Sequence, residues 1–328
     1  MPPAEPPPPT HVPSPPSFGT RVPHFLADPL THLPEWLPES LRRTSSVDMV
    51  PLPMGELLLI GAARHHDGST ASVHATLAAD RTLRALELDP DLPGAHQLIG
   101  HNVGRGFRAA VTPLTEPESL PAVLLLELPV AAFLSGYGSL YIGSMPGPLS
   151  DESIANMPAD ICAGWISDGV MMGHTRDDRM VPTPDGPSAP LGIDDQFHPM
   201  PPLAPNTMRR QRLLSRHEDE VWAMFRDTYA RPDGQVIVLH EYTITATLEP
   251  IWPGPLGSSR IRSAYPTARV LPWPECPLAA ASAERIAGHP VEDLRRLIKQ
   301  EFTGISTCTH LNDLLASLAQ VDSLQSLR

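Results

Sequence analysis

The residues best suited to chemistry in this 328-residue chain are a cysteine and a histidine two positions apart, Cys308 and His310. Ser306 or Thr307 is a natural helix N-cap, which would place Cys308 in the first turn of a helix. There the helix dipole and the free backbone N–H groups would lower the pKa of the thiol. The pattern therefore favours a thiolate nucleophile or a soft metal ligand. The alternative is a small buried residue packed beneath the start of the helix.

A second group of candidates lies on and beside a β-branched, alternating segment that predicts a strand over 236–248. Alternation directs His240 and Glu241 to opposite faces of that strand. A buried Glu241 needs a partner, and Arg226 on the preceding predicted strand is the candidate, as a structural ion pair. His240 would act as a general base or a ligand, because imidazole titrates near neutral pH. We add Asp227, the neighbour of Arg226, to the catalytic candidates.

His65 is the last catalytic candidate, and it precedes a turn at 67–68 that could equally leave it exposed to solvent. Metal sites need at least three converging ligands, and the chain has no C-x-x-C, H-E-x-x-H or acidic calcium loop. Cys308, His310, His240 and Cys162 would form such a site if folding brought them together, which spacing cannot decide. We therefore predict no cofactor and keep a metal as the less favoured alternative. Phosphate-binding loops, dinucleotide fingerprints and G-x-S-x-G elbows are also absent.

The two halves of the chain resemble weak copies of each other. The shared features are an opening arginine pair (Arg42-Arg43 and Arg209-Arg210), a Gly-His tetrad (100–103 and 288–291) and a closing apolar helix (122–134 and 308–318). Aligning the closing helices sets Glu127 opposite Asp313, Leu124 opposite His310 and Ala122 opposite Cys308. We interpret the shared acids as structural and the differing positions as candidates for function.

Each half is predicted to place strands before helices. The first has predicted strands over 57–62, 72–79 and 83–88, then helices over 98–111 and 120–136; the second has predicted strands over 221–229, 236–248, 260–263 and 268–271, then helices over 279–287, 291–302 and 308–321. This order is typical of an α+β fold rather than of alternating βαβ units. We predict two weakly duplicated units, each an antiparallel strand set followed by helices, packed pseudo-symmetrically.

Composition divides the chain into four regions. Residues 1–41 are rich in proline and predict a mostly disordered tail, since the chain has 41 prolines and many of them lie here. The first repeat unit covers 42–143 and the second 208–328. Between them, 144–207 is a connector rich in proline, glycine and aspartate with one ordered stretch at 160–172.

Charge and cysteine content restrict the partners and the compartment. A formal net charge of −13 argues against binding to nucleic acid or to an anionic membrane surface. Three widely spaced cysteines predict no disulfide framework and favour the reducing cytoplasm. The longest apolar run, 122–134, is expected to be too short to span a bilayer, and no secretory signal is visible. We expect a soluble cytoplasmic protein.

Several motifs together resemble a known family. They are 303–315 (TGISTCTHLNDLL), 274–277 (PECP), 240–242 (HEY), 225–227 (FRD) and 134–137 (LSGY). Over about 42–321 the chain resembles the bacterial domain-of-unknown-function family 2889. The family has no assigned function. What the resemblance implies about function is limited to an association with genes for the breakdown of aromatic or steroid-like carbon sources.

Two functions remain open at this point. The first is a small-molecule catabolic enzyme of lyase, isomerase or hydrolase type. It would use acid–base or thiolate chemistry on a largely apolar, aromatic or steroid-like substrate in a cleft between the two repeats. The second is a non-catalytic ligand- or metal-binding accessory protein. In both cases the expected partner is a small molecule, and a homodimer is compatible with the sequence.

Overall fold

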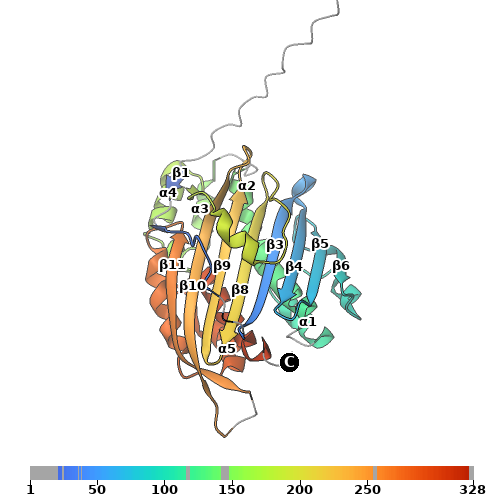
Figure 1. Ribbon diagram of the computed structural model, residues 1–328. Helices are drawn as coiled ribbons and strands as arrows, with labels where there is room; N and C mark the ends of the chain where they lie inside the picture. Colours follow the sequence, from blue (N-terminus) through green and yellow to red (C-terminus); the bar gives the residue numbers. More distant parts are fainter. Residues whose placement is uncertain are drawn as a thin grey trace, which may run out of the picture.

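A nine-stranded antiparallel sheet forms the centre of the computed structural model, which describes residues 21–23, 26–35, 37, 39–115, 119–141, 148–253 and 257–324 (Figure 1). Its strands follow the order β2-β11-β10-β9-β8-β3-β4-β5-β6. They are β2 (Leu26–Ala27), β3 (Leu41–Pro51), β4 (Leu57–His65), β5 (Thr70–Leu77), β6 (Leu83–Asp89), β8 (Met208–His217), β9 (Glu220–Ala230), β10 (Val236–Pro250) and β11 (Ser259–Leu271). A separate parallel pair joins β1 (Arg21–Pro23) to β7 (Thr183–Asp185).

Helices α1 (Phe107–Val111), α2 (Leu120–Tyr141) and α5 (Leu294–Glu301) lie behind the sheet as it is drawn in Figure 1. The other α-helices are α3 (Asp151–Ala155), α4 (Val170–Asp178) and α6 (Thr309–Ser317). The 3-10 helices are η1 (Pro53–Gly55), η2 (Ala95–Leu98), η3 (Thr112–Leu114), η4 (Ala163–Trp165), η5 (Leu191–Gln196), η6 (Cys276–Ile286), η7 (Val291–Asp293), η8 (Leu318–Gln320) and η9 (Asp322–Leu324). The long helix α2 packs on β3, β4 and β5, whereas α6 packs on β9 and η6 on β11.

The packing of α2 against β4 depends on a glycine. A Cβ atom at Gly61 would lie 2.6 Å from Cγ1 of Val73 and 3.3 Å from Cδ2 of Leu124, so only glycine permits this approach of helix to strand. Leu57, Leu59 and Ala63 alternate with less buried neighbours along β4 and share one core with α2.

The stretch 120–138 of α2 is long and apolar enough to cross a membrane, contrary to the expectation that the apolar run is too short. However, 67% of this stretch is buried inside the protein. Its one carboxylate, Glu127, accepts a hydrogen bond of 2.7 Å from the Ser45 hydroxyl of β3. These contacts make α2 a core helix packed within the protein.

The predicted order of strands before helices is confirmed in both halves, and the mixed α and β class with it. Strands β3 to β6 are consecutive neighbours in the sheet, and so are β8 to β11. The two sets meet where β3 pairs antiparallel with β8, in the register Ser45 to Arg212. The predicted strands over 260–263 and 268–271 form one continuous strand, β11.

One predicted helix was wrong, and two central strands were missed. The helix expected over 98–111 is interrupted, since η2 ends at Leu98 and α1 begins only at Phe107. Gly100 and Gly106 adopt positive φ angles of 88° and 94°, a conformation that a continuous helix excludes. The central strands β3 and β8 were not predicted at all.

The N-terminal segment and the connector are more ordered than predicted. The first twenty residues of the expected tail lie outside the described residues. From residue 26 onward the segment packs on the sheet, because β2 pairs with β11 and the side chain of Leu33 is only 6% exposed. Leu33 joins Ile193 and Phe197 of the connector in a small core against Leu213 and Met224. This part of the connector therefore covers the sheet face opposite to α6, whereas Ala163, Met171 and Met172 of the connector pack in the core on the helix side.

Candidate functional site

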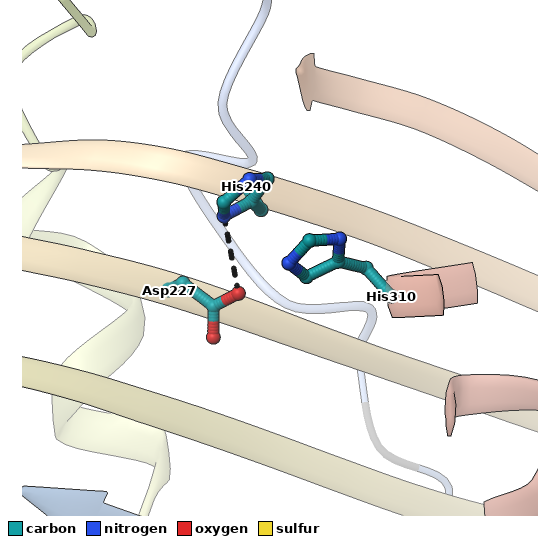
Figure 2. Close-up of side chains that lie close together, drawn as sticks. All are labelled: Asp227, His240 and His310. Carbon is teal, nitrogen blue, oxygen red and sulfur yellow. Dashed lines mark ion pairs between the residues drawn. The ribbon is translucent and has the colours of Figure 1, made fainter. Parts of the chain in front are cut away.

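A buried cluster of one carboxylate and two imidazoles lies between the sheet and α6 (Figure 2). Asp227 comes from β9 and His240 from the directly paired position of β10. His310 comes from the first turn of α6. One polar atom of each side chain lies within 4.8 Å of those of the other two. Folding thus brings together residues that are up to 83 positions apart in the sequence, from Asp227 to His310.

The two imidazole rings are stacked. Their centroids are 3.9 Å apart with an angle of 20° between the planes. Nδ1 of His240 lies 3.4 Å from Oδ2 of Asp227. Burial first, and then the neighbouring His240, lower the pKa of His310 well below its ordinary value. His310 is therefore a neutral imidazole at neutral pH.

The thiol of Cys308 contacts the other side of His310, with Sγ 3.9 Å from Nδ1. Cys308 is itself the N-cap of α6, with an extended backbone (φ −129°, ψ 127°), and so precedes the first turn. Burial raises the pKa of this thiol to about 12, although the backbone N–H groups of Leu311 and His310 lower it. The expectation of a lowered thiol pKa was wrong, because loss of water outweighs the helix terminus. Cys308 is a protonated thiol at neutral pH.

All three cysteines of the chain line one cavity beside this cluster, with a volume of about 40 Å³. Cys162 and Cys276 join Cys308 there, and all three are free and buried. His240 and His310 form part of the same wall. The remaining lining is largely aromatic and apolar: Phe133, Tyr137, Ile161, Gly164, Trp165, Leu271, Pro272, Trp273 and Thr309. The sequence spacing could not decide whether four of the candidates lie together. The fold does bring them to one cavity: Cys162, His240, Cys308 and His310.

Exposed apolar side chains border the cavity at the junction of α2 and the connector. Phe133 of α2 is 60% exposed and Ile161 is 38% exposed. Deeper in the wall, the ring of Tyr137 lies 5.0 Å from that of His240, edge to face. The cavity therefore combines an apolar entrance with a polar, imidazole-bearing interior.

Arg210 of β8 fixes the carboxylate of Asp227 from the side opposite His240. Its Nη1 donates to both carboxylate oxygens, each at 2.9 Å, and its guanidinium lies 4.1 Å from the ring centre of Phe225. Burial raises the pKa of Asp227, while Arg210 and His310 oppose that rise. The carboxylate is held in one orientation, facing both imidazoles.

A network of ion pairs extends behind this site. Asp313 of α6 binds Arg212, Arg210 and Arg108. Burial alone would raise the pKa of Asp313, but the arginines outweigh it and hold the pKa well below its ordinary range. Nη1 of Arg212 also lies 3.7 Å from Glu127 of α2. The two acids aligned from the sequence therefore meet the same arginine, and both contacts tie helices to the central strands.

The donor types of Asp227, His240 and His310 are those that zinc and related ions accept. Their arrangement fits an ion poorly. A metal must lie near the plane of each imidazole that binds it, because the nitrogen lone pair lies in that plane. One ion cannot satisfy two rings stacked face to face, and both oxygens of Asp227 already accept hydrogen bonds from Arg210. The geometry suits proton transfer better than coordination.

The remaining predicted site residues lie elsewhere. Arg226 and Glu241 form the expected buried ion pair. The pair anchors the N-terminal segment, because Nη2 of Arg226 donates to the Leu30 carbonyl at 2.5 Å and the Leu30 amide donates to Glu241 at 2.6 Å. Alternation places them on the sheet face opposite to His240. His65 lies at the end of β4, where burial first and Arg43 second lower its pKa to about 4.

The members of the site and its support that sequence reasoning missed include Arg210, Tyr137, Cys276 and Trp273. Arg210 was visible only as half of a repeated arginine pair, and Tyr137 and Cys276 only inside family motifs. Arg210 is flanked by Arg209 and Gln211, so no apolar pattern around it indicates a buried position.

The sequence model of the family described as "Protein of unknown function (DUF2889)" matches residues 208–323. No curated protein and no solved structure matches the chain. The matched segment runs from β8 to η9 and contains Asp227, His240, Cys308 and His310. Six of the described residues that line the cavity lie outside it: Phe133, Tyr137, Ile161, Cys162, Gly164 and Trp165.

Proposed function

Since residues 208–323 belong to domain-of-unknown-function family 2889, whose description assigns no activity, we propose a function from the site itself. The protein is an enzyme that moves a proton on a small, largely apolar substrate. His310 is the general base, and the reaction is of lyase or isomerase type.

One observation carries this proposal. Nε2 of His310 is buried and has no hydrogen-bond partner among the described residues. An unsatisfied buried polar atom costs about 1–3 kcal/mol, so a histidine serving only the fold would be expected to have a partner. Burial keeps this imidazole neutral and therefore able to accept a proton. Perturbed titration of this kind, next to a cavity, is typical of functional sites.

The neighbours of His310 support that role. When Nδ1 carries the ring proton it faces the sulfur of Cys308, and the lone pair on Nε2 is then available for substrate. After Nε2 accepts a proton, the imidazolium lies beside the carboxylate of Asp227, which favours the charged form. His240 and Arg210 hold that carboxylate in place. Asp227 and Cys308 are thus positioning residues for the base.

The state of the thiol narrows the reaction type. Cys308 is protonated at neutral pH, so a thiolate nucleophile, and with it a thiol hydrolase, has less support than proton abstraction. A cavity of about 40 Å³ holds little more than one water molecule, so only the reacting end of a substrate enters it. The apolar body would lie against Phe133 and Ile161 at the entrance. These side chains support an aromatic or other apolar substrate, and a catabolic role would fit it.

We also propose that the two units arose by duplication and that the site is a specialised feature of the second. The repeated strand order and the antiparallel junction of β3 with β8 support this. In the aligned closing helix of the first unit, Leu124 and Ala122 stand where His310 and Cys308 stand in the second.

Deuterium exchange tests the proposed activity. Small aromatic and aliphatic compounds with acidic C–H bonds would be incubated with the protein in D₂O and followed by proton NMR. We expect loss of one proton signal with the wild type, none with His310→Gln, and an unchanged rate with His96→Gln, an exposed histidine remote from the site. Exchange that persists in His310→Gln would remove the basis of the proposal.

A non-catalytic ligand-binding protein is the second candidate. The small volume of the cavity and the buried, protonated Cys308 favour it. If a compound shifts the NMR signals of cavity residues but no C–H proton exchanges, this second function replaces the first.

A further inference from the structure

Two buried polar side chains of the cavity beside α6 have no hydrogen-bond partner among the described residues. One is the imidazole of His310 at Nε2, and the other is the indole of Trp273 at Nε1. Trp273 follows the end of β11 and is only 2% exposed, and His310 is 8% exposed. An indole N–H only donates a hydrogen bond, whereas Nε2 of a neutral imidazole accepts one when Nδ1 carries the ring proton. The same cavity therefore presents one unused donor and one unused acceptor.

The indole of Trp273 turns its N–H edge towards the cavity lining. A Cβ atom at Gly164 would lie 2.9 Å from Cδ1 of Trp273, the ring atom bonded to Nε1, and 2.6 Å from Sγ of Cys276. Both Gly164 and Cys276 line the cavity. The edge that bears the N–H thus lies beside a residue of the lining, and a larger residue than glycine at that position would displace it.

The other polar groups of the lining are weaker candidates for a donor. Burial raises the pKa of all three cysteine thiols, so they are neutral, and a thiol is a weak donor. The hydroxyl of Tyr137 is hydrogen-bonded to the side chain of Trp165. Thr309 is only partly buried, so solvent can satisfy its hydroxyl. Trp273 is therefore the strong donor that is both buried and unused.

The lining offers no formal charge to an anionic group. None of the described residues that line the cavity is an arginine, a lysine, an aspartate or a glutamate. A carboxylate or a phosphate that entered would be buried without a cation in contact with it, which is costly. The cavity therefore suits a neutral polar group at the reacting end of a substrate.

From these groups we infer that the substrate is a neutral carbonyl compound with a C–H bond next to the carbonyl, and that Trp273 is a second catalytic residue. The carbonyl oxygen accepts a hydrogen bond from the indole N–H, while the neighbouring carbon faces Nε2 of His310. This inference rests on the proposed role of His310 as the base.

The two residues act on the same step. Nε2 of His310 takes the proton from the carbon, the electron pair of that C–H bond forms a C=C bond, and the π pair of the carbonyl moves to oxygen. The hydrogen bond from Trp273 strengthens as negative charge grows on this oxygen, so it stabilises the transition state more than the ground state. Return of the proton to the same or to another carbon completes an exchange or an isomerisation, and no co-reactant is needed.

Deuterium exchange with a matched pair of probes tests the inference. 1-Indanone and indene are similar in size and each has an acidic C–H bond on its five-membered ring, but only 1-indanone has a carbonyl group. Exchange above the uncatalysed background is followed by proton NMR in D₂O. We expect the wild type to exchange 1-indanone and not indene, and Trp273→Phe to exchange 1-indanone about a hundredfold more slowly, as is typical when one donor to an oxyanion is removed. Trp252→Phe, at a position that is 84% exposed, is the control and should keep the wild-type rate.

A binding measurement checks the role of Trp273 without turnover. 2-Naphthol is a stable enol with fused rings, and its oxygen should take the place of the carbonyl oxygen. We expect it to move the indole Nε1–H signal of Trp273 in a proton–nitrogen NMR spectrum and to leave that of Trp252 in place. This measurement uses only the wild-type protein, so it decides the question even if Trp273→Phe does not fold, which circular dichroism checks.

The outcomes separate this inference from the proposed function. Exchange of 1-indanone by Trp273→Phe at the wild-type rate, equal exchange of indene and 1-indanone by the wild type, or an unmoved Trp273 signal would overturn the inference and leave His310 as the base. Exchange of 1-indanone that persists in His310→Gln, or no exchange of either probe by the wild type, would overturn the proposed function and this inference with it.

Discussion

Replacement of His310 by leucine should make the protein more stable, and this expectation separates a functional histidine from a structural one. The gain arises from Nε2, whose burial without a partner among the described residues costs about 1–3 kcal/mol. The loss is the ring stacking on His240, worth about 0.5–1.5 kcal/mol, and a long contact of 3.9 Å with the Cys308 sulfur. Leucine is apolar and of similar size, and Leu124 occupies the aligned position in α2. We expect His310→Leu to raise the free energy of unfolding by about 1 kcal/mol.

Urea denaturation followed by tryptophan fluorescence measures this change as a shift of the midpoint at constant slope. His96→Leu, at an exposed position, is the control and should leave the midpoint nearly unchanged. The His310→Leu variant should also differ from the wild type in how its stability depends on pH. The pKa of His310 lies well below 6.5 in the folded protein, whereas an unfolded chain takes up the proton near 6.5. The wild-type protein therefore keeps its full stability above pH 6.5 and loses part of it as the pH falls below 6.5. His310→Leu lacks this titrating group and should resist mild acid better than the wild type.

A decrease of the free energy of unfolding by more than about 2 kcal/mol in His310→Leu would refute this reasoning, because such a loss is typical of a residue that stabilises a core. An unchanged slope of stability against pH would refute the argument on the buried neutral imidazole.

Three further expectations follow from the same electrostatics. The pKa values of His65 and His198 are both lowered to about 4. Each histidine should therefore reduce the free energy of unfolding by at most about 1.4 kcal/mol per pH unit as the pH falls from 6.5 to 4. In the variant with both histidines replaced by glutamine, the free energy of unfolding should depend less steeply on pH in an acid denaturation. Asp313→Asn should lower the free energy of unfolding by about 3–5 kcal/mol, because it leaves buried arginines without their carboxylate. Asp151→Asn, which removes an exposed ion pair, is the control and should change it by less than about 1 kcal/mol in the same urea titration. Iodoacetamide should modify Cys308 far more slowly than a free thiol at neutral pH, as measured by peptide mass analysis; rapid labelling would contradict the pKa of about 12.

The parts of the fold that could be predicted from the sequence are those in which local pattern and burial agree. The alternation along 236–248 and the turn at 233–234 identify β10 and its hairpin with β9 because apolar and polar positions there follow the strand period. The closing helices were recognised by their apolar spacing. The pairing of Arg226 with Glu241 followed from the cost of burying either charge alone.

The strands that were missed fail the pattern for a physical reason. Strand β8 contains four arginines in ten residues, and such a composition indicates a solvated surface. Three of these side chains bind carboxylates on β9, α6 and η9, namely those of Arg210, Arg212 and Arg216. Acids that are distant in the sequence thus allow a charged strand at the centre of the sheet, and hydrophobic periodicity cannot detect that pairing.

The error on the Cys308 pKa has a similar origin. A helix N-terminus acts over one turn and is visible in the sequence, whereas burial depends on everything packed around the thiol. Residues from α2, the connector and β11 line the cavity beside Cys308, and local pattern indicates none of them. The sequence could therefore suggest the residue types of the site but not their protonation states.

The position of the site follows from the way charges are balanced in the interior. On the helix side of the central strands, Ser45 binds Glu127, while Arg212 binds Asp313 at the corresponding place in the second half. The second half adds another buried arginine, Arg210, which holds Asp227 and so allows a carboxylate to lie beside neutral imidazoles. Without that arginine, Asp227 would be expected to take up a proton at neutral pH and could no longer favour an imidazolium at His310. Arg210→Met should therefore abolish proton exchange in a folded protein even though Arg210 does not line the cavity, and retained exchange would show that Asp227 has no part in activating the base.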